Sequence, residues 1–380
     1  MNPGIDQLLA AVSLAALLIA RHGLASLSTR SAVAARLRQL YAIVAALFAL
    51  RLFAFYFGSS LVVVLTMIVA AWLPFVGLRL TEDLVRRHAP RLVKIGVLAG
   101  GIAFTVIAVT LGLVWSAQAL LGLALFQALA LATMVVHLMR HRSDIAPSER
   151  STADTFLLLL VVTIPLALSD FQQLAPGLPV RGGAFAALLF ALTTTRLAWG
   201  EGTRLGLAAD ILVILAAALI GGFAGTTMLS IPATAAIQLG ALCGTLAALA
   251  LIVERGLREP ARQSGIVAAV AALPGSADTS AILAAHPLLA GSRILGPVEL
   301  AGYPPESLSR LRQFRVIREG LGDSDVRDAA ADILAATAST HLVRLGAEPP
   351  SFLAVAAGGL AGAALDNELD LIARLLEKRL

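Results

Sequence analysis

Nine long apolar runs constrain this chain more than any other feature of its sequence. A membrane-spanning helix needs about 20 predominantly apolar residues, and runs of about 17 are tolerated. Nine segments approach that length, and the sixth and seventh are among the shortest. They are 5–20, 40–57, 61–78, 95–114, 119–139, 155–169, 184–199, 205–224 and 229–253. The sequence therefore predicts an all-α fold, a polytopic helical membrane bundle of about nine transmembrane helices.

The composition agrees with a membrane environment. Hydrophobic residues make up 58% of the chain and charged residues only 14%, whereas soluble domains contain about 25% charged residues. The basic excess lies in the membrane half, because residues 1–262 contain 19 Lys/Arg and 11 Asp/Glu, while residues 263–380 contain 10 and 13. Membrane topology explains this excess. The high pI is therefore no argument for nucleic-acid binding.

The basic residues between the runs indicate how the chain is oriented. The stretch 79–94 holds five Lys/Arg between two apolar runs, and basic residues in short loops stay on the cytoplasmic side. If all nine runs cross the membrane, the connections on one side hold 17 Lys/Arg and those on the other hold only Arg181. We therefore expect a multi-pass protein of the cell inner membrane, with its N-terminus outside and its C-terminus in the cytoplasm.

The residues after the ninth run predict a small, mainly α cytoplasmic domain. Residues 263–305 are rich in Gly, Pro and Ala and suggest loops with short elements. The segments 308–319, 326–345 and 367–380 have helical patterns. The apolar segment 352–365 is too short to span a membrane comfortably, so we expect it in the core of this domain. The expected organisation is a seven-helix membrane region (1–200), an additional transmembrane hairpin (201–256) and the cytoplasmic C-terminal domain (257–380).

Arg51 is the most costly side chain to place in the membrane half. It lies six residues before Phe57, roughly 9 Å from the outer end of the second run at 1.5 Å per residue. Burying such a charge costs a few kcal/mol or more unless the side chain pairs or reaches water. One interpretation is a ligand contact beneath the outer surface, paired with Asp170 at the outer end of the sixth run. The other is an arginine that extends to the lipid headgroups.

Asp210 lies inside the eighth run and is the second unusual charge. Acids within a membrane are candidates for function, and with Glu201 it could form a proton or cation path. Alternatively, the helix dipole and Arg204 stabilise it near a helix N-terminus. The candidate residues for a ligand or ion pathway are Arg51, Asp170, Asp210 and Glu201.

Two other motifs match known chemistry only in part. His137 and His141 are spaced i and i+4, but the Glu of an HExxH zinc site is missing and neighbouring arginines would repel a cation, so we interpret them as interfacial anchors. The apolar segment 352–356 precedes Gly358, Gly359 and Gly362, yet the first glycine of GxGxxG is absent, which favours a small-residue helix over nucleotide binding. We expect no metal, no cofactor and no catalytic residue, and an enzymatic function is not expected.

Several features of the first 200 residues follow one layout. They are the outside N-terminus, Leu73-Pro74-Phe75 in the third run with a charged loop after it, Ile164-Pro165 in the sixth run, and an outer loop at 172–183. This layout resembles the seven-helix membrane region at the N-terminus of some bacterial sensor histidine kinases. The resemblance implies a sensor module that relays an external or membrane signal inward. Two further runs follow here, and the tail lacks the kinase motifs, so no catalytic residue is carried over.

Two functions follow from these observations. The first is a sensor or scaffold in the lipid bilayer that relays to a cytoplasmic protein partner through residues 263–380, because few polar residues lie within the membrane and the tail is structured. The alternative is a small-solute or ion transporter that uses Arg51 and Asp210 together with proline-kinked helices.

Overall fold

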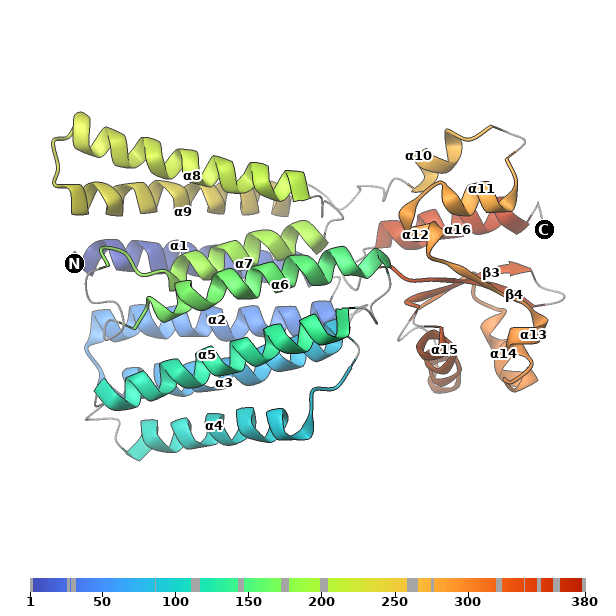
Figure 1. The fold of residues 1–380 in the computed structure, drawn as a ribbon, viewed down its shortest axis with the longest axis horizontal. Helices are drawn as coiled ribbons and strands as arrows, with labels where there is room; N and C mark the ends of the chain where they lie inside the picture. Colours follow the sequence, from blue (N-terminus) through green and yellow to red (C-terminus); the bar gives the residue numbers. More distant parts are fainter. Residues whose placement is uncertain are drawn as a thin grey trace.

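A computed structural model describes most of the chain. The described residues are 3–25, 28, 32–85, 87–110, 117–142, 147–171, 178–198, 204–257, 266–274, 277–318, 323–337, 339–346, 350–357 and 363–377. Two parts are visible in Figure 1, a bundle of long helices and a smaller C-terminal domain that lies beyond one end of it.

The bundle consists of the helices that the apolar runs predict. Their bounds are α1 (Pro3–Gly23), α2 (Ala32–Phe57), α3 (Ser60–Val85), α4 (Arg91–Thr110), α5 (Ala117–His141), α6 (Pro147–Leu168), α7 (Gly183–Ala198), α8 (Arg204–Thr227) and α9 (Ala233–Leu257). Successive helices run in opposite directions (Figure 1), so the last turns of α2, α4, α6 and α8 lie at the same end of the bundle as the first turn of α1. We call this the N-terminal end of the bundle and the opposite one, next to the C-terminal domain, the domain end.

Most helices of the bundle are long and apolar enough to cross a membrane. Among the described residues, seven of them qualify as membrane spans by length and hydropathy, α1 to α5, α8 and α9. The apolar parts of α6 and α7 are shorter, Thr152–Leu168 and Gly183–Thr195. The polytopic, helical membrane fold is therefore confirmed, while the crossing of the membrane by all nine helices stays a prediction.

The interior of the bundle is packed with side chains from α1 to α7 and α9. Tyr41 and Leu192 are fully buried there, and the Tyr41 hydroxyl is hydrogen-bonded to Thr194 of α7. At opposite edges of the bundle (Figure 1), α4 packs on α3 and α5, and α8 packs on α9. The helices α8 and α9 are in close contact at Gly240, where an added Cβ would overlap the carbonyl oxygen of Ala218. Large apolar side chains cover the outside, as lipid requires.

The C-terminal domain is mainly helical, as expected, but it also contains an antiparallel sheet. Its elements are α10 (Ile266–Ala271), α11 (Thr279–Ala284), α12 (Pro287–Ala290), β1 (Arg293–Leu295), α13 (Pro297–Leu300), α14 (Pro305–Leu311), β2 (Val316–Arg318), α15 (Ser324–Ala336), β3 (His341–Gly346), β4 (Ser351–Val355) and α16 (Ala363–Glu377). The strand order is β1-β4-β3-β2, with all neighbours antiparallel.

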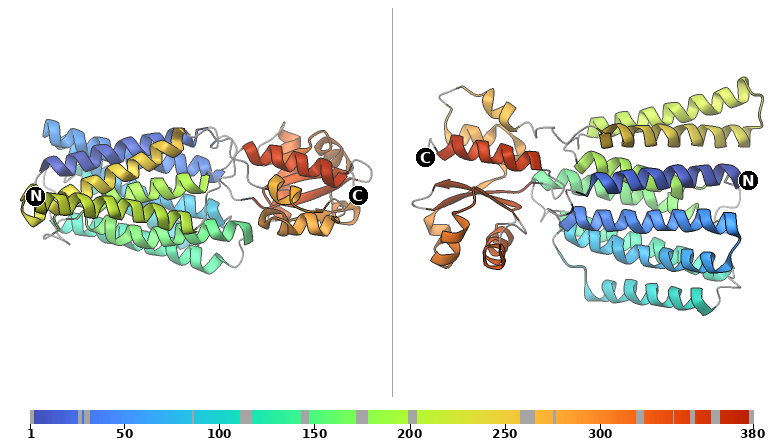
Figure 2. Two further views of the ribbon diagram at one scale, coloured as in Figure 1. Left: turned by 90° about the horizontal axis from the view of Figure 1, so that it is seen from above. Right: turned by 180° about the vertical axis from the view of Figure 1, so that it is seen from behind.

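The sheet separates two layers of helices. In Figure 2, α16 lies on one face together with α10 to α12, and α13 to α15 lie on the other. Each face has its own hydrophobic core, because neighbouring residues of a strand point to opposite sides. Leu353 and Val355 of β4 pack toward α16, whereas Phe352 and Ala354 pack toward α14 and α15.

The sheet corrects part of the expected helix pattern. The segment 308–319 is helical only to Leu311 and contains β2, and the segment 326–345 is helical only to Ala336 and contains most of β3. The segment 352–365 lies in the domain core as expected, but it begins in the strand β4. The glycines at 358, 359 and 362 lie outside the described residues.

Candidate functional site

Arg51 and Asp170 form the centre of a charged cluster at the N-terminal end. Arg51 Nη1 donates a hydrogen bond to Asp170 Oδ2 at 3.1 Å, and each side chain is 27% exposed. Asp170 follows the last turn of α6, and its Oδ1 accepts a hydrogen bond from the backbone N–H of Gly183, 2.8 Å away, at the start of α7. The expected pairing is therefore present, and the same carboxylate also caps a helix.

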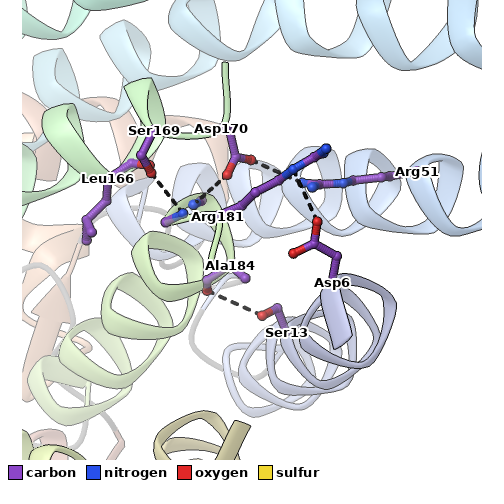
Figure 3. A network of polar contacts seen from close by, with 10 residues as sticks. Asp6, Ser13, Arg51, Leu166, Ser169, Asp170, Arg181 and Ala184 are labelled. Carbon is purple, nitrogen blue, oxygen red and sulfur yellow. Dashed lines mark hydrogen bonds and ion pairs between the residues drawn. The ribbon is translucent and has the colours of Figure 1, made fainter. Parts of the chain in front are cut away.

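A second ion pair lies beside the first. Arg181 Nε is 3.2 Å from Oδ2 of Asp6, which belongs to the first turn of α1. Burial lowers the pKa of Arg181, the nearby charge of Arg51 lowers it further, and Asp6 and Asp170 oppose both effects. An arginine stays protonated at physiological pH, so the cluster contains two cations and two anions and is neutral overall. Figure 3 shows the four side chains converging from different segments.

The residues just before α7 are hydrogen-bonded to the end of α6. The N–H of Gly182 donates to Ser169 Oγ at 2.8 Å, and Ser169 Oγ donates to the carbonyl of Leu166 at 2.7 Å. A Cβ at position 183 would overlap the carboxylate of Asp170, so a larger residue there would displace that carboxylate. The end of α6 and the start of α7 are thereby held together beside Arg51.

Two hydrogen bonds join this region to other helices. Ser13 of α1 donates to the carbonyl of Ala184 at 3.3 Å (Figure 3). Gln238 of α9 donates through Nε2 to the carbonyl of Pro179 at 3.0 Å, and Gln238 is buried. The cluster therefore contacts α1, α2, α6 and α7 directly, and α9 through Pro179.

The other two candidate residues do not belong to this cluster. Asp210 is buried near the start of α8, six residues after Arg204, whereas Arg51 lies six residues before the end of α2. Because α2 and α8 run in the same direction, Asp210 lies toward the domain end and Arg51 toward the N-terminal end. Glu201 lies outside the described residues.

His137 and His141 are each hydrogen-bonded to a backbone carbonyl, His141 within α5 and His137 on the connection between α3 and α4. His137 Nε2 is 3.2 Å from the carbonyl oxygen of Arg87, and His141 Nδ1 is 3.0 Å from the carbonyl oxygen of His137. Within the described ranges, no group of three or more His, Cys, Asp or Glu side chains is placed to hold a metal ion.

Sequence reasoning missed two buried carboxylates. Glu82 accepts hydrogen bonds from Lys94 Nζ at 2.8 Å and from the N–H of Ala89 at 2.7 Å, and so fixes the connection between α3 and α4. Glu368 of α16 accepts from the N–H groups of Ile266 and Val267, at 3.0 and 3.4 Å, and so caps α10. Glu82 lies in the charged stretch 79–94, and Glu368 lies in a helix with other acids at its start. In each case the sequence does not distinguish the buried acid from its exposed charged neighbours.

The fold and the cluster define a polytopic helical membrane protein with a folded C-terminal domain. A scan against protein-family models and searches of curated proteins and of solved structures give no match.

Proposed function

We propose that this chain is a non-enzymatic membrane sensor that relays a change at the N-terminal end of its bundle to a cytoplasmic partner through its C-terminal domain. The observation that carries the proposal is the hydrogen bond between Gln238 and Pro179. It connects the charged cluster to α9, the helix that leads into the C-terminal domain. In this proposal the N-terminal end faces the outside, as the distribution of basic residues predicts.

In this proposal the signal acts on the ion pairs of the charged cluster. Its ion pairs are partly buried, so an ion or ligand that competes for Arg51 or Asp170 would release α2 from the start of α7. The connection that contains Pro179 and Arg181 would then lose its anchor on Asp170 at Gly183. Because α9 is bonded to Pro179, its position depends on the state of the cluster.

The domain end supplies the second half of the relay. The helix α9 ends at Leu257, and the next described element, α10, begins at Ile266. The first two N–H groups of α10 are bonded to the buried carboxylate of Glu368. A displacement of α9 would therefore act on α16, which covers one face of the sheet (Figure 2).

The geometry favours a sensor over the transport hypothesis. A transport path needs its polar residues along one route, and substrate sites commonly lie near the middle of the bilayer. Arg51 is instead paired with Asp170 near one end, and Asp210 lies toward the other. The layout of the first 200 residues, which resembles the seven-helix sensor region of histidine kinases, is a second support for the sensor.

Hydrogen exchange of the full chain in lipid nanodiscs tests this proposal. Asp170→Asn removes the charge that pairs with Arg51, and we expect faster exchange both at the start of α7 and in α10 and α16. The matched control is Asp154→Asn, which breaks the ion pair with Arg142 at the other end of α6 and should leave α10 and α16 unchanged. Adding Gln238→Leu should abolish the remote response to Asp170→Asn while the local response at α7 persists.

A response of Asp170→Asn that is confined to α7 would contradict the relay. The chain would then be better described as a scaffold, with a C-terminal domain that does not report on the membrane region.

A further inference from the structure

The connection between α3 and α4 is held in one conformation by a buried acid. Glu82 is only 3% exposed, and it is bonded both to Lys94 and to the backbone N–H of Ala89. A carboxylate buried this deeply is destabilising unless it is paired and hydrogen-bonded. The polar contacts of Glu82 therefore constrain the connection on both sides of Pro90.

Two cations face solvent here, Arg87 in the connection and Arg91 at the start of α4. The carbonyl of Arg87 is bonded to His137 of α5, so the Arg87 backbone is fixed from a second direction. The side chains of Arg87 and Arg91 are exposed, and within the part of the chain that the structure describes no carboxylate pairs with either of them. The backbone is thus fixed next to two exposed guanidinium groups that have no carboxylate partner among the described residues.

An apolar face begins directly beside these cations. Leu92 is 84% exposed, and the exposed side chains that continue along α4 include Ile95, Ile102, Val106 and Val109. Their spacing of three, four or seven residues places them on one side of the helix. Since α4 lies at the edge of the bundle (Figure 1), this face is open along the length of a membrane-spanning helix.

We infer that Arg87 and Arg91 bind the phosphate of an acidic phospholipid, whose acyl chain lies along the exposed face of α4. Guanidinium groups bind phosphate oxygens in a fixed fork geometry. A soluble anion would use the cations alone, and an acidic peptide would leave the apolar face without a partner. A phospholipid matches both features, because its anionic and apolar parts are joined at the boundary that Arg91 and Leu92 form.

Native mass spectrometry of the full chain in detergent tests this inference, with palmitoyl-oleoyl phosphatidylglycerol and phosphatidylcholine as the two probes. An arginine close to an anionic lipid surface changes affinity about fivefold. Arg87→Gln with Arg91→Gln should therefore lower the affinity for phosphatidylglycerol roughly 25-fold and leave phosphatidylcholine binding unchanged. The matched control is Arg310→Gln with Arg374→Gln, which removes the same charge from the C-terminal domain and should change neither affinity.

Glu82→Gln distinguishes a built site from a diffuse positive patch. The substitution removes a negative charge and frees Lys94, so a diffuse patch would bind phosphatidylglycerol more strongly. A site that depends on the conformation of the connection should bind it more weakly. Stronger binding by this variant, an unchanged affinity in the double arginine variant, or displacement of the lipid by an equal concentration of inorganic phosphate would each overturn the inference.

Discussion

Arg51 and Asp170 are 119 positions apart in the sequence, and their side chains meet at 3.1 Å where α2 passes the junction of α6 and α7. The same carboxylate caps α7 at Gly183. One carboxylate, at the end of α6, thus bonds to both α2 and α7.

The first prediction concerns the strength of this ion pair. Asp170→Asn and Arg51→Gln should each destabilise the bundle by about 1–3 kcal/mol, because each leaves a partly buried charge without its partner. The double variant should lose less than the sum of the two, with a coupling energy of about 1 kcal/mol. Chemical unfolding in detergent measures all three variants. Additive losses would show that the two side chains do not stabilise each other.

The second prediction concerns Gly183. The variant Gly183→Ala should perturb the cluster, because its Cβ would overlap the carboxylate of Asp170 and push it away from Arg51. We expect a lower thermal unfolding midpoint for this variant. The control is Gly96→Ala in α4, where an added Cβ meets no atom within 4 Å. If both variants unfold at the same temperature, Gly183 does not have the close contact described here.

One of the two ion pairs of the charged cluster can be predicted from the sequence, and the other cannot. Arg51 and Asp170 can be paired from the sequence, because both charges lie near the same expected side of the membrane at the ends of apolar runs. The partnership of Arg181 with Asp6 does not follow from the sequence, although Arg181 is the single cation of the connections that are expected to lie outside. Its partner lies in the first turn of α1, where an isolated acid has the pattern of an ordinary helix start.

The sheet can be predicted only in part. The strands β1 and β2 have three residues each, which is too short for an alternating pattern to be recognised. Residues 341–345 are mostly apolar and follow a helix, so their pattern favours a continuation of that helix. Their antiparallel pairing with β4 depends on residues that are adjacent only in the folded chain.

The third prediction concerns the link between α10 and α16. Glu368→Gln keeps the shape of the side chain but weakens its hydrogen bonds to the first amides of α10. A helix cap contributes about 1 kcal/mol, so exchange in α10 should become about fivefold faster. Hydrogen exchange with mass spectrometry resolves this segment. The comparison is Glu377→Gln, an exposed acid near the end of α16, which should leave α10 unchanged. Equal exchange of α10 in the two variants would show that Glu368 does not cap this helix.

The fourth prediction concerns pH and His286. Its Nδ1 accepts a hydrogen bond from the N–H of Leu288 at the start of α12, and burial lowers the pKa of His286 below its ordinary value of 6.5. The unfolded state therefore binds the proton more readily. Neutral His286 therefore stabilises the folded state fully above about pH 6.5. This contribution to stability is lost as the pH falls from there through the lowered pKa of His286 in the folded state.

Hydrogen exchange of α12 at pH 5 and pH 7.5 checks this behaviour. The segment should be less protected at the lower pH once intrinsic exchange rates are taken into account. In His286→Asn a capping oxygen without a proton to gain replaces the imidazole, so the difference between the two pH values should shrink. A pH response that is identical in the two proteins would assign it to another group.

In the proposed sensor, the charged cluster and the C-terminal domain lie on opposite sides of the membrane. Single cysteines at Ser59 and Ser309, each in a Cys243→Ala background, test this with a membrane-impermeant maleimide applied to intact cells. Ser59→Cys, beside the N-terminal end, should be labelled in intact cells, and Ser309→Cys, in the C-terminal domain, should be labelled only after the cells are opened. Labelling of both positions in intact cells, or of neither until lysis, would place them on one side and contradict the account.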